Sequence, residues 1–290
     1  MIQKQAKLHH DTQSLLGEGP VWDSNSNLLY WVDITGCRLH TLDVRIDEHH
    51  THAFDEFVCA VSPGEQGRLL VALATRLVFF DPLTGQIEDI CAVEPDLPNN
   101  RCNDGKRDPA GRFWIGTMAF AGENRQGAGS LYRLDGDQLS RVIHDLTISN
   151  GMGWSPDSRT MYFIDSPRRE VWAFDFDPAD SSLSNQRTIL RTSESMGVPD
   201  GMTVGPDGSL WIAQWGGACV NQWDAQTGEL LCRIDTGCPH TTSCCLTPHG
   251  DLYITTAREG LSLEALEAAP ASGGLFRMEN LTPPRSAAIA

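Results

Sequence analysis

The chain has 290 residues and a formal net charge of −16, and it contains 27 Gly, 16 Pro and 8 Trp. This excess of acidic groups argues against a nucleic-acid partner, because the phosphate backbone would repel it. No run of 18 apolar residues occurs, so no transmembrane helix is expected, and segment 1–11 lacks the apolar core of a secretion signal. The nine Cys form no CxxC pairs, and we therefore interpret them as reduced thiols of a cytoplasmic protein.

One pattern recurs six times along the chain: an apolar strand, a turn rich in small and polar residues, and a second strand centred on an aromatic residue or Leu. Successive centres are separated by 40, 44, 48, 49 and 42 residues. The centres are Tyr30, Leu70, Trp114, Tyr162, Trp211 and Tyr253. This spacing is the length of a four-stranded propeller blade, so the sequence predicts an all-β, six-bladed β-propeller.

The two ends of the chain indicate how this ring would close. A third predicted strand follows each copy, but in the sixth copy it lies at 275–278, and two prolines and a short tail follow it without room for a fourth. A surplus segment, 5–12, precedes the first copy instead. We expect it to supply the missing outer strand, since closure removes exposed sheet edges. The predicted organisation is one domain over residues 1–280 and a tail over 281–290.

Four copies carry an acidic residue or Asn directly before a Gly, just upstream of the first strand. These residues are Glu18, Asp104, Asn150 and Asp200. The first strand of a propeller blade lines the central channel, so we expect the four side chains to meet on one rim. A set of oxygen ligands without thiolate or imidazole suits Ca²⁺, Mg²⁺ or Mn²⁺. Zn²⁺ usually recruits His or Cys, but it is kept as an alternative. The competing interpretation is that Asp-Gly and Asn-Gly are simply turns.

Three longer segments are expected to open on the same rim. They are 93–102, 117–129 and 257–273, and the last contains a predicted helix over 261–268. Arg101 lies two residues from Asn103, where a cation can hold an oxygen-rich ligand. The alternative for a lone Arg is a surface salt bridge.

Several motifs along the chain are specific. They are Gly17-Glu18-Gly19-Pro20-Val21-Trp22, Arg101-Cys102-Asn103-Asp104-Gly105-Lys106, Gly116-Thr117-Met118, Ser149-Asn150-Gly151-Met152, Pro199-Asp200-Gly201-Met202 and Ala213-Gln214-Trp215-Gly216-Gly217. In these motifs the chain resembles the senescence-marker-protein-30/gluconolactonase family, also called the regucalcin-like family. The resemblance extends from about residue 15 to residue 277.

The resemblance implies a six-bladed propeller with one divalent cation, Ca²⁺ first among the candidates, in its channel. It implies Glu18, Asn150 and Asp200 as metal ligands, and Asp200 also as the catalytic acid and base. It implies Arg101 and Asn103 as substrate-binding residues.

Two refinements follow from the same resemblance. It points to Asn103 rather than Asp104 as the residue facing the pocket, which leaves Asp104 as support behind the ligands. Some family members that act on sugar lactones carry a Glu soon after the Gly-Thr-Met motif, where this chain has Ala121. Ala121 cannot hydrogen-bond a sugar hydroxyl through its side chain, and Glu123 is the candidate substitute.

These expectations predict a metal-dependent lactonase that hydrolyses a sugar-acid lactone, such as gluconolactone or a pentonolactone, to the aldonic acid. The chain lacks Gly-x-Ser-x-Gly and His-Glu-x-x-His motifs, which disfavours serine-hydrolase and zincin mechanisms. Two alternatives stay open. One is a hydrolase of other lactones or organophosphates, favoured by an apolar pocket with Phe120, Met152 and Trp215. The other is a non-catalytic calcium-binding propeller. The expected partner is a small lactone, with neither nucleic acid nor membrane, and the oligomeric state is open.

Overall fold

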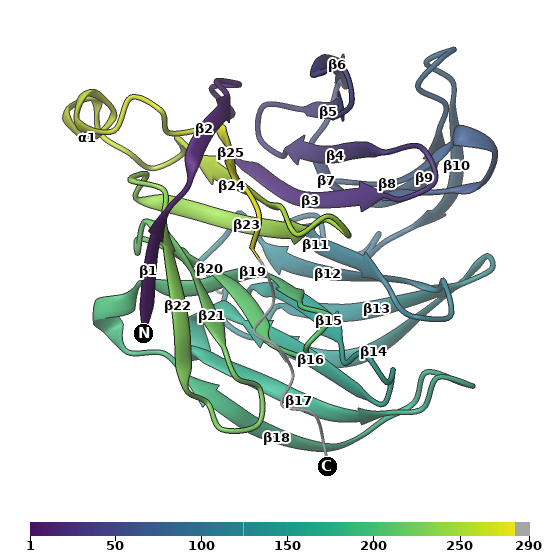
Figure 1. Ribbon diagram of the computed structural model, residues 1–290. Helices are drawn as coiled ribbons and strands as arrows, with labels where there is room; N and C mark the ends of the chain where they lie inside the picture. The colour runs from purple at the N-terminus through teal and green to yellow at the C-terminus, as the bar shows by residue number, and fades with distance from the viewer. Residues whose placement is uncertain (124, 282–290) are drawn as a thin grey trace.

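The computed structural model describes residues 1–123 and 125–281, which form β-strands over most of their length (Figure 1). Four separate four-stranded sheets occur within these residues. The first contains β3 (Gly17–Asp23), β4 (Leu28–Asp33), β5 (Arg38–Asp43) and β6 (Glu48–Ala53). The second contains β7 (Val58–Pro63), β8 (Leu69–Leu73), β9 (Arg76–Phe80) and β10 (Ile87–Ala92). The expectation of an all-β chain with four-stranded sheets is confirmed.

The next two sheets repeat the same antiparallel order. The third contains β11 (Asn100–Arg107), β12 (Phe113–Ala119), β13 (Gly129–Asp135) and β14 (Gln138–Leu146). The fourth contains β15 (Ser149–Trp154), β16 (Thr160–Asp165), β17 (Glu170–Phe176) and β18 (Leu183–Arg191). Short 3₁₀ turns lie at Glu65–Gly67, Ser166–Arg168 and Glu194–Met196.

The last two groups of strands are joined into one nine-stranded sheet by a single bridge between Trp215 and His240. One group contains β19 (Val198–Val204), β20 (Leu210–Trp215), β21 (Cys219–Trp223) and β22 (Leu230–Asp235). The other contains β23 (His240–Leu246), β24 (Leu252–Ala257) and β25 (Leu275–Met278). The first strand of each group contacts the first strand of the next, and β23 contacts β3. This arrangement is consistent with a β-propeller.

Burial changes systematically across each group of strands. The first strands are almost wholly buried, as in β15, whereas outer strands such as β6 are mostly exposed. Figure 1 shows the first strands toward the middle of the molecule and the outer strands toward its edge. Apolar side chains pack between neighbouring sheets; one cluster between the third and fourth contains Trp114, Met152 and Phe163. Polar side chains on the first strands therefore lie in surroundings poor in water.

The N-terminal segment supplies the outer strand beside β25, as expected from the surplus residues before the first copy. β2 (Lys7–His10) lies antiparallel to β25, with Leu8 opposite Phe276. The sequence did not predict β1 (Ile2–Gln5), which adds a parallel strand to β22. The helix α1 spans Leu263–Ala268, two residues shorter than expected, because the side chain of Ser262 caps it by accepting from the Ala265 amide at 3.2 Å.

Residues 282–290 of the expected C-terminal tail lie outside the described residues. Within the described part of the chain, none of the helices has the length and apolar character needed to cross a membrane.

Removing residues 1–10 should destabilise the protein strongly, because β25 and β22 would both lose a hydrogen-bonded neighbour. We expect the thermal midpoint to fall by at least about 4 °C, the shift that corresponds to roughly 1–2 kcal/mol in a large domain. Removing residues 1–5 alone is the matched control, since it leaves β2 in place and should cost less. Equal midpoints for the two truncations, measured by calorimetry, would show that β2 contributes nothing.

Candidate functional site

Every first strand carries an irregularity at the same point of its pairing with the second strand. In β3 the register shifts between Glu18 and Val21, and the other five first strands shift at the equivalent point. At each shift the first strand contains one more residue than its partner, which defines a β-bulge. A bulge bends the strand and redirects its side chains, so these positions can present polar groups toward the middle of the molecule.

The pairing also corrects the alignment of the third copy. In each first strand, one residue pairs with the aromatic centre of the second strand. Asp200, Glu18 and Asn150 each lie three residues before that paired residue in their own strand. In β11 the residue at this distance is Asn103, and Asp104 lies one position further along. The alignment of Asp104 with the other three, based on its following Gly, is therefore wrong by one residue.

The glycines after these residues are not turn residues. Gly105, Gly151 and Gly201 lie inside β11, β15 and β19. A Cβ atom on Gly151 would lie 2.5 Å from the carbonyl oxygen of Asp200 in the neighbouring first strand. The absence of side chains here lets adjacent first strands approach closely. The interpretation of these pairs as simple turns is wrong.

Three buried carboxyl groups from different sheets influence one another. Burial raises the pKa of Glu18 well above its ordinary value, and the carboxylates of Asp200 and Asp104 raise it further. Burial also raises the pKa of Asp200 well above its usual range, again with a contribution from Asp104. The guanidinium of Arg101 acts in the opposite direction on Glu18 and Asp200. Burial raises the pKa of Asp104 as well, and the ammonium of Lys106 opposes this.

Asn150 completes the set of oxygen donors. Its Nδ2 donates to the hydroxyl of Ser166 at 3.1 Å, while its buried Oδ1 has no hydrogen-bond partner within the described residues. A buried acceptor without a partner is rare in folded proteins and is often explained by an ion or a water. Together with the carboxylates of Glu18 and Asp200, this free oxygen fits a hard divalent cation better than an ion that prefers imidazole or thiolate.

Arg101 and Asn103 form a connected pair beside these donors. The Arg101 guanidinium donates to Oδ1 of Asn103 and to the carbonyl of Cys102, both at 2.7 Å. Nδ2 of Asn103 donates to the carbonyl of Ser149 at 2.9 Å, which ties β11 to the start of β15. Both side chains are buried, so the interpretation of Arg101 as a surface salt bridge is wrong.

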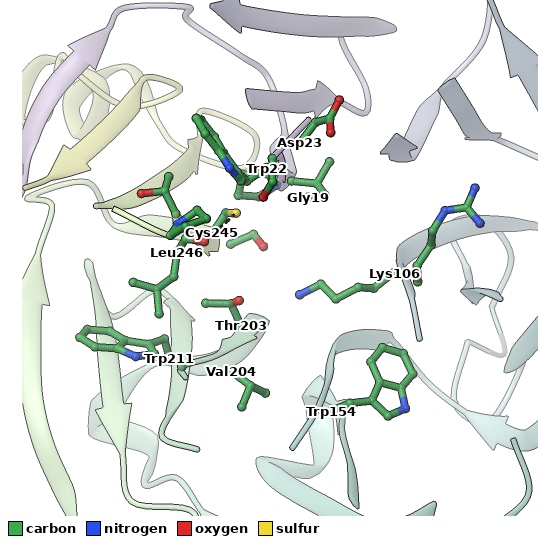
Figure 2. A pocket seen from close by; sticks show the side chains of 18 of the residues that line it. Gly19, Trp22, Asp23, Lys106, Trp154, Thr203, Val204, Trp211, Cys245 and Leu246 are labelled. Atoms are coloured by element: carbon green, nitrogen blue, oxygen red, sulfur yellow. Dashed lines mark hydrogen bonds between the residues drawn. The ribbon is translucent and has the colours of Figure 1, made fainter. Parts of the chain in front are cut away.

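Lys106 was part of a motif, but its position was not predicted. Its Nζ donates to the carbonyl of Met202 at 2.7 Å, so the side chain reaches from β11 to β19 past the intervening β15. It extends into a cavity of about 790 Å³ at the other end of the first strands (Figure 2). Trp22, Trp154 and Trp211 surround this cavity, whereas Glu18, Asn150 and Asp200 do not line it. The available signal was a cation directly after the Asp104-Gly105 pair.

Glu94 is a second residue that sequence reasoning missed. One carboxylate oxygen accepts from the hydroxyls of Thr117 and Tyr132 at 2.9 and 3.0 Å, and the other accepts from Asn100 at 2.7 Å. It thereby joins the segment before Arg101 to the second and third strands of the same sheet. Nothing in the sequence around Glu94 distinguishes it from a surface carboxylate.

The apolar residues considered for an alternative substrate have different surroundings. Phe120 is 40% exposed, and its ring centroid lies 6.0 Å from that of Phe57. Trp215 stacks on His240 with a centroid distance of 3.9 Å. Met152 is wholly buried in the core between two sheets, so it cannot line a pocket. Of the three residues considered for an apolar pocket, Met152 is therefore removed.

Comparison with known proteins gives the family. The model of the SMP-30/Gluconolactonase/LRE-like region matches residues 16–258. Regucalcin from Danio rerio is 38% identical over 272 residues, which cover 92% of this chain and 91% of that protein. L-arabinolactonase from Azospirillum brasilense is 38% identical over 278 residues, which cover 94% and 91%.

A solved structure agrees with these relatives. The crystal structure of a calcium-binding regucalcin from Agrobacterium tumefaciens matches with a TM-score of 0.89 and 29% identity over 97% of both chains. The region that the family model matches, residues 16–258, includes every site residue described above. The chain therefore belongs to the SMP-30/gluconolactonase/LRE-like family.

Proposed function

We propose that this protein hydrolyses a sugar-acid lactone with the help of one divalent cation held by Glu18, Asn150 and Asp200. The observation that carries the proposal is the buried set of oxygen donors, in which two carboxylates repel each other's charge and Oδ1 of Asn150 has no partner among the described residues. The similarity to an L-arabinolactonase over nearly the whole chain supports the same reaction class.

We also propose a single domain, residues 1–280, built as a closed ring of six blades. The contact of β23 with β3 and the pairing of β2 with β25 support closure. In such a ring the bulges of β3, β15 and β19 would bring the three proposed ligands to one rim. The nine free cysteines support a reducing compartment, the cytoplasm.

The donor set favours Ca²⁺, with Mg²⁺, Mn²⁺ and Zn²⁺ as alternatives, because all three ligand atoms are oxygens. When bound, the cation supplies a Lewis acid that polarises the lactone carbonyl and offsets the charge that develops as water attacks. Asp104 lies beside the ligands and adds negative charge that favours the cation.

Asp200 is the proposed acid and base. Its carboxylate accepts a proton from the attacking water and returns it to the ring oxygen as that oxygen leaves. In the cation-free protein, burial and the neighbouring Asp104 raise the pKa of Asp200, and a bound cation would act in the opposite direction because it favours the charged carboxylate.

Arg101 and Asn103 are the proposed substrate-binding residues. The Arg101 guanidinium carries five N–H donors, and its bonds to Cys102 and Asn103 come from one nitrogen, so donors remain for substrate hydroxyls. Its hydrogen bond to Asn103, and that of Asn103 to Ser149, fix both side chains in orientation. A substrate held by preoriented donors meets the attacking water in a reactive pose. Ala121 offers no side-chain acceptor, so the choice of sugar depends on other groups.

Chelation of divalent cations should abolish lactone hydrolysis, and added Ca²⁺, Mn²⁺, Mg²⁺ or Zn²⁺ should restore it. A pH indicator measures the rate with aldonolactones, simple lactones and a phosphotriester. Full activity in protein shown to be metal-free would remove the cation from the mechanism. Preference for simple lactones or the phosphotriester would replace the proposed substrate class, and cation binding without any hydrolysis would support the calcium-binding alternative.

Asp200→Asn should lower kcat by about 10²- to 10⁴-fold, the range expected for loss of an acid and base. Cation affinity is measured separately by calorimetry, and rates are compared at saturating cation, so that loss of a ligand is not mistaken for loss of the base. Asp207→Asn, in the exposed turn after β19, is the control and should keep wild-type turnover. Wild-type turnover of Asp200→Asn would refute the assigned role.

Asp104→Asn should stabilise the cation-free protein near pH 7. The native pKa values of Glu18, Asp104 and Asp200 are raised, so the native state holds more protons than the unfolded state above about pH 4, and its stability falls as pH rises. Removing one carboxylate flattens this slope, and the advantage shrinks toward pH 4. Calorimetry in chelator from acidic to neutral pH measures it, with the exposed Asp137→Asn as control. Identical slopes in wild type and Asp104→Asn would contradict the repulsion.

A further inference from the structure

We propose that His9, His10 and Asp47 form a second cation site, selective for a transition metal of the zinc type, that clamps the N-terminal strand to the first sheet. Among residues 1–123 and 125–281, these three offer ligand atoms that all lie within 4.8 Å of one another. The site lies outside the channel, where β2 passes the turn between β5 and β6.

The two distances to Asp47 suit a tetrahedral ion, and the two imidazole nitrogens lie within 4.8 Å of each other. Nε2 of His9 lies 3.2 Å and Nε2 of His10 lies 3.1 Å from the same carboxylate oxygen of Asp47. Zn–N and Zn–O bonds of about 2.0–2.1 Å in a tetrahedron place neighbouring ligand atoms roughly 3.3 Å apart. The two imidazole rings are nearly perpendicular, with centroids 4.7 Å apart, so both nitrogens can point at one centre.

A β-bulge is what brings the two histidines together. Consecutive side chains of a regular strand point to opposite faces, so His9 and His10 could not share a ligand. In the pairing of β2 with β25, Leu8 lies opposite Phe276 and His10 opposite Leu275, which makes His9 the extra residue. The bulge turns both rings toward Asp47.

The ligand chemistry separates this site from the channel. Two imidazoles and one carboxylate suit Zn²⁺, Cu²⁺ or Ni²⁺, whereas the oxygen-only channel suits Ca²⁺ or Mg²⁺. The nearby cation Arg277 is compensated, because it pairs with Asp251 at 2.6 Å and with Glu279 at 3.3 Å. These two carboxylates therefore weaken the repulsion between Arg277 and a cation bound at His9, His10 and Asp47.

Ordered aromatic rings support the position of His10. The His49 ring lies 5.3 Å from that of His10, and its Nε2 lies 3.1 Å from Nδ1 of His40. His40 in turn stacks on Trp31 with a centroid distance of 4.9 Å. Asp47 is 63% exposed, so water can complete the coordination of an ion.

A cation bound here would connect the strand that pairs with β25 to the hairpin of β5 and β6. Because the ligands come from residues 9–10 and 47, the unfolded chain would bind the ion less well than the folded chain. Binding to the native state alone raises stability by mass action. The competing arrangement is a hydrogen-bonded cluster in which the imidazoles donate to Asp47 and no metal binds.

The test is Zn²⁺ titration by calorimetry of Ca²⁺-saturated protein, with thermal midpoints measured in parallel. Wild type should bind Zn²⁺ at His9, His10 and Asp47 and gain thermal stability. Asp47→Asn, an exposed change that spares the fold, and His10→Gln should each weaken this binding by more than about tenfold, a loss seen even for outer partners of metal ligands. His50→Gln is the control, since His50 lies on the same hairpin and pairs with Glu48 at 3.1 Å.

Cu²⁺ provides a readout that separates the two sites. Electron paramagnetic resonance should show nitrogen coupling from imidazole in wild type and in Asp200→Asn, and lose it in the His9→Gln, His10→Gln double variant. Persistence in Asp200→Asn makes the outcome independent of the proposed channel site. Equal Zn²⁺ affinity and stabilisation in wild type and Asp47→Asn, or nitrogen coupling that survives the double variant, would overturn the proposal.

Discussion

The structure depends on placing three carboxyl groups from separate sheets in one buried region. Glu18, Asp104 and Asp200 each lose hydration there, and their mutual repulsion raises the pKa of Glu18 and of Asp200 beyond the effect of burial. Such a cluster is unfavourable unless positive charge lies nearby. Arg101 supplies part of that charge, and Lys106 acts on Asp104 from the other end of the channel. The charge that remains supports the proposed cation.

The backbone is shaped around that cluster. Bulges in the first strands present its side chains, and glycines such as Gly151 let neighbouring strands approach within contact distance. The hydrogen bond from Asn103 to the carbonyl of Ser149 then connects two sheets directly at the site. Site and fold are therefore coupled, because glycines beside the polar residues set the spacing of the first strands and Asn103 connects two of these strands.

The two proposed cation sites use bulges in different ways. In the channel, bulges on separate sheets present oxygen donors to one region, which suits a hard ion. In β2, one bulge turns the adjacent residues His9 and His10 to the same side, and imidazole nitrogens suit a zinc-type ion. The first arrangement would serve the proposed reaction. The second would connect β2, which pairs with β25, to the hairpin of β5 and β6 in the first sheet.

The repeat spacing determined from the sequence alone that the chain is all-β with four-stranded units, because turn residues and strand centres are local signals. The motifs also pointed to Glu18, Asn150 and Asp200, the proposed ligands, and the surplus segment before the first repeat predicted the outer position of β2. The strand pairing makes Asn103 rather than Asp104 equivalent to these residues, in agreement with the resemblance and against the alignment by the following Gly. Two features were decided only by the tertiary structure. Lys106 and Glu94 acquired partners far along the chain, and His9, His10 and Asp47 met because β2 crosses to the first sheet. Contacts between distant segments depend on how sheets pack, which local sequence patterns do not encode.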